Sequence, residues 1–224
     1  MQKTVLLNDA AVVAIPIHEN KEPMIDLREQ QLIQYGPSPE IDNNQCYTYL
    51  RSGLYELLCK AQERLPDGLR LCVYEGWRSL ELQQKLFDDR FNVLKKDFSN
   101  WTYEKLFWET CRLVSPVILL DGSRNVFPHS TGGAVDIYLI DQDDNLIDMG
   151  LSVANWFDDI DGGLSVTDSV KISPLTLKNR QLMSQALTAV GLVNYPNEYW
   201  HWSYGDRYWA YITHNSTAFY GAVD

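Results

Sequence analysis

Residues Pro128–Leu139 read PHSTGGAVDIYL, and this stretch decides the fold. From Ala134 to Ile140 the residues are mostly apolar or β-branched, which predicts a strand that a Gly-Gly turn leads into. Successive side chains of a strand point to opposite faces, so Asp136 is expected on the face away from the core. Because glycine lets the backbone fold back, His129 can reach the same side of the strand. The residues expected on the core face are Val135, Ile137 and Leu139.

A histidine and an aspartate that meet at the start of a strand form an incomplete metal site, since catalytic zinc takes three protein ligands and one open position. The third ligand is expected in Pro196–Trp202, PNEYWHW, where large aromatic residues flank His201 and would exclude water. Glu198 stands three residues earlier and is expected to take a proton from attacking water and pass it to the leaving amine. Positions i and i+3 of a regular strand face opposite ways, so Glu198 is expected in the turn before the strand or at a bulge.

Length and charge restrict the function further. The chain has 224 residues, 45% of them hydrophobic, which is enough for a core in one domain spanning 1–224, with residues 1–45 as an N-terminal arm packed on it. The formal net charge of -11 argues against nucleic acid and against an anionic membrane as partners. A small-molecule partner is expected, and the oligomeric state stays open.

The four cysteines are scattered without a Cys-x-x-Cys pair, which favours buried thiols of a reducing compartment. The apolar run near the N-terminus is too short for a signal peptide, and no stretch approaches the roughly 20 apolar residues that span a bilayer. A cytoplasmic location is therefore expected. The cysteines are Cys46, Cys59, Cys72 and Cys111.

Periodicity and turn signals predict an α+β fold. Helices are expected over 47–64, 79–95, 98–117 and 174–191. Strands are expected over 10–17, 69–74, 116–120 and 134–140, the last in a hairpin with 146–149. The segment 150–170 is expected to be irregular. It is either a loop that covers substrate or a calcium loop, although its spacing does not match that of an EF-hand.

Arg78 follows Gly76 at the junction between the predicted strand and the helix that Ser79 would cap. A guanidinium fixed at such a junction could hold a substrate carboxylate or a developing oxyanion, or it could form a structural ion pair. Asp26 and Arg28 in the N-terminal arm are expected to be solvated rather than part of a site.

Together these motifs resemble the zinc D-alanyl-D-alanine dipeptidases of the vancomycin-resistance type. The matching segments, in family order, are Glu75–Arg78, His129–Leu139, Met149–Gly150, Phe157–Asp158 and Glu198–Trp202. The resemblance implies a hedgehog/D,D-peptidase-like fold, a single domain whose central, mostly antiparallel sheet is flanked by helices. It also implies one Zn²⁺ per chain and hydrolysis of D-Ala-D-Ala or a related dipeptide.

The resemblance assigns a role to each matching residue. His129, Asp136 and His201 would bind zinc, and Glu198 would be the general base of metal-activated water. Arg78 would stabilise the oxyanion, and Asp158 would hold the free ammonium of the dipeptide.

One departure concerns substrate choice. The family usually has small polar residues just before the first zinc histidine, where this chain has Phe127 and Pro128. An aromatic ring cannot replace the lost hydrogen bonds. The alternatives are a D,D- or L,D-carboxypeptidase acting on peptidoglycan peptides and a non-catalytic relative that binds zinc. Retention of Glu198 and Arg78 counts against the non-catalytic reading, because binding alone needs neither.

Overall fold

The computed structural model describes residues 4–36, 45–152 and 155–223. Its α-helices are α1 Ala10–Val13, α2 Ser52–Gln62, α3 Leu80–Asp97, α4 Tyr103–Thr110, α5 Pro174–Thr188 and α6 Arg207–Ile212. Its strands are β1 Met24–Asp26, β2 Gln34–Tyr35, β3 Tyr49–Arg51, β4 Arg70–Glu75, β5 Ala134–Ile140, β6 Val193–Asn194 and β7 His201–Ser203. The 3-10 turns are η1 Leu27–Glu29, η2 Gln45–Thr48, η3 Pro128–Thr131 and η4 Trp156–Asp158.

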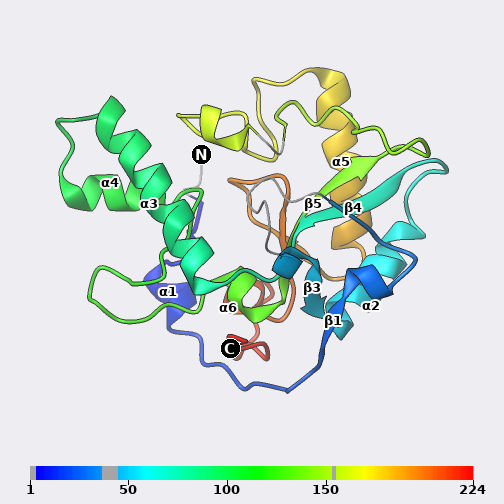
Figure 1. The fold of residues 1–224 in the computed structure, drawn as a ribbon, viewed down its shortest axis with the longest axis horizontal. Helices are drawn as coiled ribbons and strands as arrows, with labels where there is room; N and C mark the ends of the chain where they lie inside the picture. The colour runs from blue at the N-terminus through cyan, green and yellow to red at the C-terminus, as the bar shows by residue number, and fades with distance from the viewer. Residues whose placement is uncertain (1–3, 37–44, 153–154, 224) are drawn as a thin grey trace.

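The central sheet has five strands in the order β2-β4-β5-β7-β6. Only the β2–β4 pair in it is parallel, and the other pairs are antiparallel. β1 and β3 form a separate antiparallel pair. Figure 1 shows α3 and α4 on one side of the molecule and the sheet with α2 and α5 on the other. The predicted α+β class, with a mostly antiparallel sheet flanked by helices, is confirmed.

The core lies between one face of the sheet and the helices α2 and α5. Val135, Ile137 and Leu139 are fully buried on β5, which confirms the face assigned to them from the sequence. They pack in one cluster with residues of both helices, which include Leu54, Leu58, Met183 and Leu187. The opposite face of β5, which carries Asp136, is therefore left for the site.

Helices α3 and α4 form a second layer with its own apolar cluster. Ser79 caps α3 by accepting a hydrogen bond from Leu82 N, as the sequence predicts. α4 is much shorter than the expected 98–117, because the Thr102 side chain caps a new helix start. The buried members of this cluster are Leu86, Phe87, Phe107, Cys111 and Val114.

Four further predicted elements differ in the structure. The expected strand 10–17 is mainly the short helix α1, whose start Asp9 caps through Ala11 N. The expected helix 47–64 begins only at Ser52, because the residues before it pair with β1. Residues 116–120 and 146–149 make only isolated bridges, through Ile118 and Leu146.

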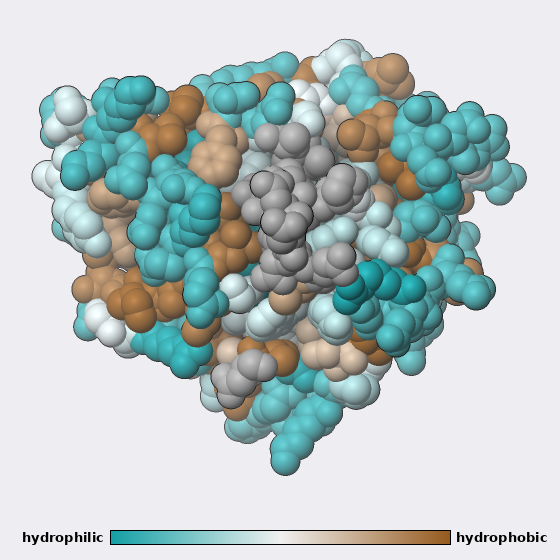
Figure 2. All heavy atoms as spheres, viewed as in Figure 1, coloured by the Kyte–Doolittle hydropathy of each residue, from teal (hydrophilic) through white to brown (hydrophobic). Residues whose placement is uncertain are grey.

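Hydrophilic residues cover much of the face that Figure 2 shows, in keeping with the net charge of -11. All four cysteines are thiols outside any disulfide; Cys72 and Cys111 are buried and the other two half-buried. Asp26 and Arg28 pair with each other. No helix among the described residues is long and apolar enough to cross a membrane.

Two buried arginines hold the described segments 149–152 and 155–167 in place. Arg180 on α5 donates to the carbonyl oxygens of Met149 (2.8 Å), Leu164 (2.9 Å) and Val166 (2.6 Å). Arg90 on α3 donates to the carbonyls of Asp159 and Ile160 at 3.2 and 2.9 Å. A segment with few regular backbone hydrogen bonds is thus tied to both helical layers through its carbonyls.

Replacing Arg180 with methionine should lower the free energy of unfolding by about 3 kcal/mol, because buried carbonyls lose their donors. Chemical denaturation measures this difference. Lys178→Met, an exposed change on the same helix, is the control and should stay within about 0.5 kcal/mol of the parent. Equal effects of the two substitutions would show that Arg180 does not anchor the segment.

Candidate metal centre and active site

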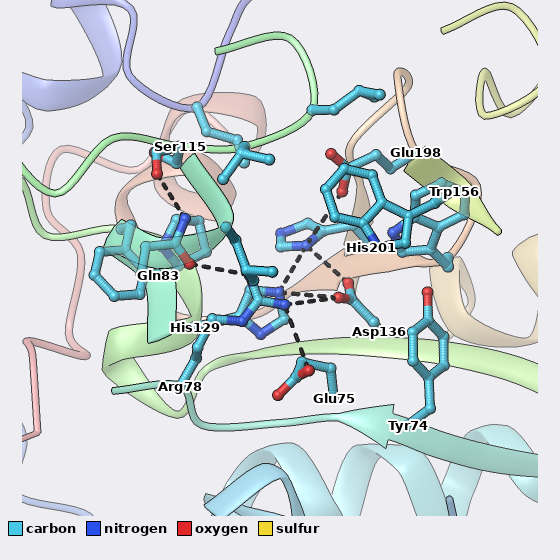
Figure 3. Close-up of a pocket in the computed structure, with 17 residues that line it drawn as sticks. Tyr74, Glu75, Arg78, Gln83, Ser115, His129, Asp136, Trp156, Glu198 and His201 are labelled. Atoms are coloured by element: carbon cyan, nitrogen blue, oxygen red, sulfur yellow. Dashed lines mark hydrogen bonds and ion pairs between the residues drawn. The ribbon is translucent and has the colours of Figure 1, made fainter. Parts of the chain in front are cut away.

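Three side chains predicted to bind metal meet in one buried pocket. His129 Nε2 lies 3.1 Å from His201 Nδ1 and 3.4 Å from Asp136 Oδ2. His201 Nδ1 lies 3.1 Å from Asp136 Oδ1. Figure 3 shows the three side chains pointing toward one another, with Arg78 and Glu75 beside them. The structure thus brings together ligands that are far apart in the sequence.

Strand register accounts for two of the three ligands. In the antiparallel pairing of β5 with β7, Asp136 is the direct partner of His201, and directly opposed residues project to the same face. In the pairing of β5 with β4, the register shifts between Val73 and Glu75, so that Glu75 becomes the partner of Asp136. This irregularity brings Glu75 beside the metal ligands, because an extra residue in a strand reverses the faces that follow it.

His129 reaches the same point from the turn η3, which ends at Gly132 in the left-handed conformation (φ +68°). Its Nδ1 lies 2.7 Å from the carbonyl oxygen of Gly76. A carbonyl only accepts, so the ring proton is on Nδ1 and Nε2 offers its lone pair to the pocket. Any Cβ at Gly76 would lie 2.6 Å from the carbonyl oxygens of Tyr47 and Tyr49, so this approach requires glycine.

The donor set fits a zinc ion. Tetrahedral coordination with bonds of roughly 2.0–2.1 Å separates ligand atoms by about 3.3 Å, and the two imidazole nitrogens are 3.1 Å apart. Each nitrogen also lies within 3.4 Å of one of the two Asp136 carboxylate oxygens, His201 Nδ1 of Oδ1 and His129 Nε2 of Oδ2. Burial lowers the pKa of His129 to about 4, so its imidazole is neutral near pH 7. Burial raises the pKa of Asp136, but His129 and His201 outweigh this effect and hold it below its usual range. His129 and Asp136 are thus in the protonation states that bind a cation.

Glu198 lies in the turn before β7, as the sequence predicts. Its backbone N–H donates to Tyr195 O, and its carbonyl accepts from His201 N. Glu198 Oε2 is 3.8 Å from His201 Nδ1, and the residue is buried. Burial and the charge of Asp136 raise the pKa of Glu198 well above its ordinary value. A carboxyl group held in this way can accept a proton and keep it.

Arg78 enters the pocket from the loop between β4 and α3. Its NH2 lies 3.4 Å from Asp136 Oδ2 and 3.7 Å from Glu75 Oε2. Its NH1 donates to Gln83 Oε1 at 2.9 Å, and Gln83 Nε2 donates to Ser115 O at 2.6 Å. The amide of Gln83 is thus fixed by both of its ends, and it fixes the guanidinium in turn.

Sequence reasoning missed Glu75 and Gln83 as members of the site. Gln83 carried one signal, since it lies one helical turn after the residue that caps α3. No sequence signal marked Glu75 as part of the site, apart from its place in the Glu75–Arg78 segment.

Apolar side chains from distant parts of the chain complete the pocket. The apolar lining is Leu7, Leu86, Leu113, Val114, Phe127, Pro128, Trp156 and Trp200. Leu7 comes from the N-terminal arm, so that arm closes part of the site. Of the two tryptophans flanking His201, only Trp200 lines the pocket. Trp202 is the strand partner of Val135 and belongs to the core.

Asp158 is not among the residues that line the pocket. It is exposed, although Trp156 of the same turn does line it. The neighbouring Asp159 is buried, but its carboxylate accepts hydrogen bonds from the backbone N–H groups of Gly163, Leu164 and Ser165. Asp159 therefore holds the loop together.

Two imidazoles and a carboxylate around one point, next to a carboxyl group and a guanidinium, define a metal-dependent peptidase site. Residues 51–218 match the family model described as D-ala-D-ala dipeptidase. The match covers most of the chain, and the chain belongs to this family of metallopeptidases.

The chain is similar to two curated proteins of this description. A D-alanyl-D-alanine dipeptidase of Synechocystis sp. is 24% identical over 241 residues, covering 95% of this chain and 96% of that protein. A D-alanyl-D-alanine dipeptidase of Escherichia coli is 26% identical over 135 residues, covering 60% of this chain and 55% of that protein.

Two solved structures are more distant. The LdcB LD-carboxypeptidase aligns with a TM-score of 0.42 and 15% identity, over 89% of this chain and 77% of that one. A vancomycin resistance D,D-pentapeptidase, VanY, in complex with Zn(II) aligns with a TM-score of 0.38 and 16% identity, over 92% of this chain and 94% of that one.

Replacing Glu198 with glutamine should stabilise the metal-free protein by an amount that grows with pH. Because the folded-state pKa of Glu198 is raised above its ordinary value of 4.5, the folded protein keeps a proton that the unfolded chain releases. The parent protein therefore loses stability as the pH rises from the ordinary pKa of a glutamate towards the raised pKa of Glu198 in the folded state. The glutamine variant lacks this loss, so its advantage should grow by up to roughly 1.4 kcal/mol per pH unit.

Denaturation in the presence of a chelator, at several pH values between about 5 and 8, measures this difference. The depressed pKa of His129 changes the free energy of unfolding of both proteins equally, so it does not contribute to the difference between them. A difference that does not change with pH would mean that Glu198 is ionised in the folded state.

Proposed function

We propose that the chain is a zinc-dependent dipeptidase that hydrolyses D-Ala-D-Ala or a related dipeptide containing a D-amino acid. One observation carries the proposal: His129, Asp136 and His201 converge in one buried pocket beside Glu198 and Arg78. The family and the Synechocystis relative, which is a D-alanyl-D-alanine dipeptidase, support the choice of substrate. His129 would offer Nε2, His201 Nδ1 and Asp136 a carboxylate oxygen to one Zn²⁺.

When bound, zinc supplies Lewis acidity that lowers the pKa of water and polarises the scissile carbonyl. Glu198 takes a proton from the attacking water at its carboxylate and passes it to the amide nitrogen that leaves. Burial raises the pKa of this carboxyl group in the metal-free protein; the positive charge of a bound cation would lower it, so that Glu198 starts as the carboxylate and then holds the proton between the two steps. A carboxylate this close to a metal ligand needs no other base.

Arg78 directs N–H groups at the oxygen on which negative charge develops. Its hydrogen bond to Gln83 keeps the guanidinium aimed into the pocket before substrate arrives, so little reorganisation is needed during the reaction. The ion pairs with Asp136 and Glu75 tie it to the metal ligands on β5 and to β4.

The pocket walls favour a short and largely apolar substrate. Phe127 is fully buried and stands where the family usually has a small polar residue, so the side chains of D-Ala-D-Ala meet an aromatic surface. Asp158 remains our proposed partner for the substrate ammonium. Its exposed position beside Trp156 means that the amino end of the substrate would extend past Trp156. The cytoplasmic location and the organisation as one domain stay predictions.

Glu198→Ala should reduce kcat for D-Ala-D-Ala by roughly 10²–10⁴-fold while the protein keeps one zinc per chain, since Glu198 moves a proton and does not hold the metal. Steady-state kinetics and metal analysis of the same preparation measure both effects. Glu104→Ala, which removes an exposed glutamate on α4, is the control. Near-normal turnover in the Glu198 variant, or in the parent protein after chelation, would rule out the mechanism.

Asp158→Ala should raise KM for dipeptides with a free amine by about tenfold, the equivalent of about 1.4 kcal/mol of lost binding, with little change in kcat. Asp161→Ala removes an exposed acid of the same loop and should leave KM unchanged. If the parent protein cleaves N-acetylated and free D-Ala-D-Ala equally well, Asp158 has no role in binding an ammonium.

A further inference from the structure

The second ring nitrogen of His201 faces away from the metal site. Because Nδ1 faces His129 and Asp136, Nε2 lies on the far side of the ring, 3.4 Å from Ser203 Oγ. Ser203 is fully buried and two residues further along β7. Residues i and i+2 of a strand project to the same face, so the pairing follows from the register of the strand.

Asp206 stands behind Ser203. It is 1% exposed, and its Oδ1 accepts a hydrogen bond from Trp209 N at 2.8 Å, which caps the start of α6. Burial raises the pKa of the Asp206 carboxyl, and the Trp209 N–H and the neighbouring Ser203 hydroxyl oppose that rise. The other oxygen, Oδ2, is buried and has no hydrogen-bond partner in the described part of the chain, so it can accept the hydrogen of the Ser203 hydroxyl.

The turn between β7 and α6 holds this carboxyl group in place. Gly205 has φ +74°, and a Cβ there would lie 2.5 Å from ring atoms of Phe219 and Tyr220. The carbonyl of Gly205 accepts from the backbone N–H groups of the same two residues. Asp206 is thus fixed from both sides, by the turn before it and by the helix that it caps.

We propose that Ser203 and Asp206 are positioning residues that orient His201 for metal binding through a hydrogen-bonded relay. His201 Nε2–H donates to Ser203 Oγ, and the Ser203 hydroxyl donates to Asp206. The relay keeps the His201 proton on Nε2, so that Nδ1 presents its lone pair to the cation. It also holds the plane of the ring. Groups of this kind behind a metal ligand typically contribute about 10–100-fold to metal affinity.

At both histidines, the ring nitrogen that faces away from the metal site is held by a hydrogen bond. His129 is fixed by a backbone carbonyl, that of Gly76, which cannot change its protonation or its direction. Among the residues that the structure describes, no such carbonyl bonds His201 Nε2, and the hydroxyl of Ser203 takes that place, with the Asp206 carboxyl group behind it. The inference rests on the proposed function only in taking His201 as a zinc ligand through Nδ1.

The test compares the parent protein with Ser203→Ala, with Asp206→Asn and with the double variant. Asparagine caps a helix as well as aspartate does, so Asp206→Asn keeps the start of α6. The substitution replaces only the oxygen that would accept from Ser203 with an N–H group, which donates. Ser169→Ala is the control, because it removes a buried hydroxyl that bonds a backbone carbonyl elsewhere. Zinc affinity is measured by competition with a chromophoric chelator, and the Co²⁺-substituted proteins are compared by their visible spectra.

Ser203→Ala and Asp206→Asn should each weaken zinc binding by about 10–100-fold and shift the Co²⁺ spectrum. The metal-free Asp206→Asn variant should melt at the temperature of the parent. The double variant should bind zinc as Ser203→Ala does, because Asp206 acts through Ser203. Ser169→Ala should leave both affinity and spectrum unchanged.

Zinc affinities and Co²⁺ spectra like those of the parent in both single variants would overturn the relay. So would losses that add in the double variant, which would mean that the residues act separately. If the parent protein binds zinc no better than a His201→Ala variant, the proposed metal site itself fails, and this result is distinct from failure of the relay.

Discussion

Asp136 and His201 face each other across β5 and β7, and the rest of the site is arranged around this one antiparallel pair. The pairing sets a carboxylate and an imidazole side by side on the face of the sheet that α2 and α5 leave uncovered. A register slip of one residue would turn Asp136 into the core and Val135 into the pocket. The apolar residues that alternate with Asp136 therefore fix the metal site as firmly as they fix the core.

This arrangement gathers charge in a buried place. The pocket lining includes the carboxyl groups of Glu75, Asp136 and Glu198 against a single guanidinium, that of Arg78. Burying such an excess of negative charge is unfavourable unless a partner compensates it. A divalent cation at the three ligands would bring the group close to neutrality. The raised pKa of Glu198 in the metal-free protein has the same cause, since burial and the charge of Asp136 both favour its protonated form.

The convergence of His129, Asp136, His201 and Glu198 could be predicted from the sequence because each is marked by local chemistry. A small-residue turn leads His129 to the strand of Asp136, and the Pro-Asn turn sets Glu198 before His201. Glu75 could not be placed, because a one-residue shift in the pairing of β4 decides its face. Gln83 and Asp206 were missed for a similar reason, since their partners lie on other elements. The expected strand 10–17 was wrong because the Asp9 cap outweighed a run of apolar residues that suits either element.

The central claim is that His129 Nε2, His201 Nδ1 and an Asp136 oxygen bind one zinc ion. Diffraction from crystals of the zinc-loaded protein, with anomalous data collected on both sides of the zinc absorption edge, tests it most directly. The account predicts one anomalous peak per chain within about 2.0–2.2 Å of those three atoms. A zinc peak at the cysteines or at the acidic loop, with these three side chains free of metal, would contradict it.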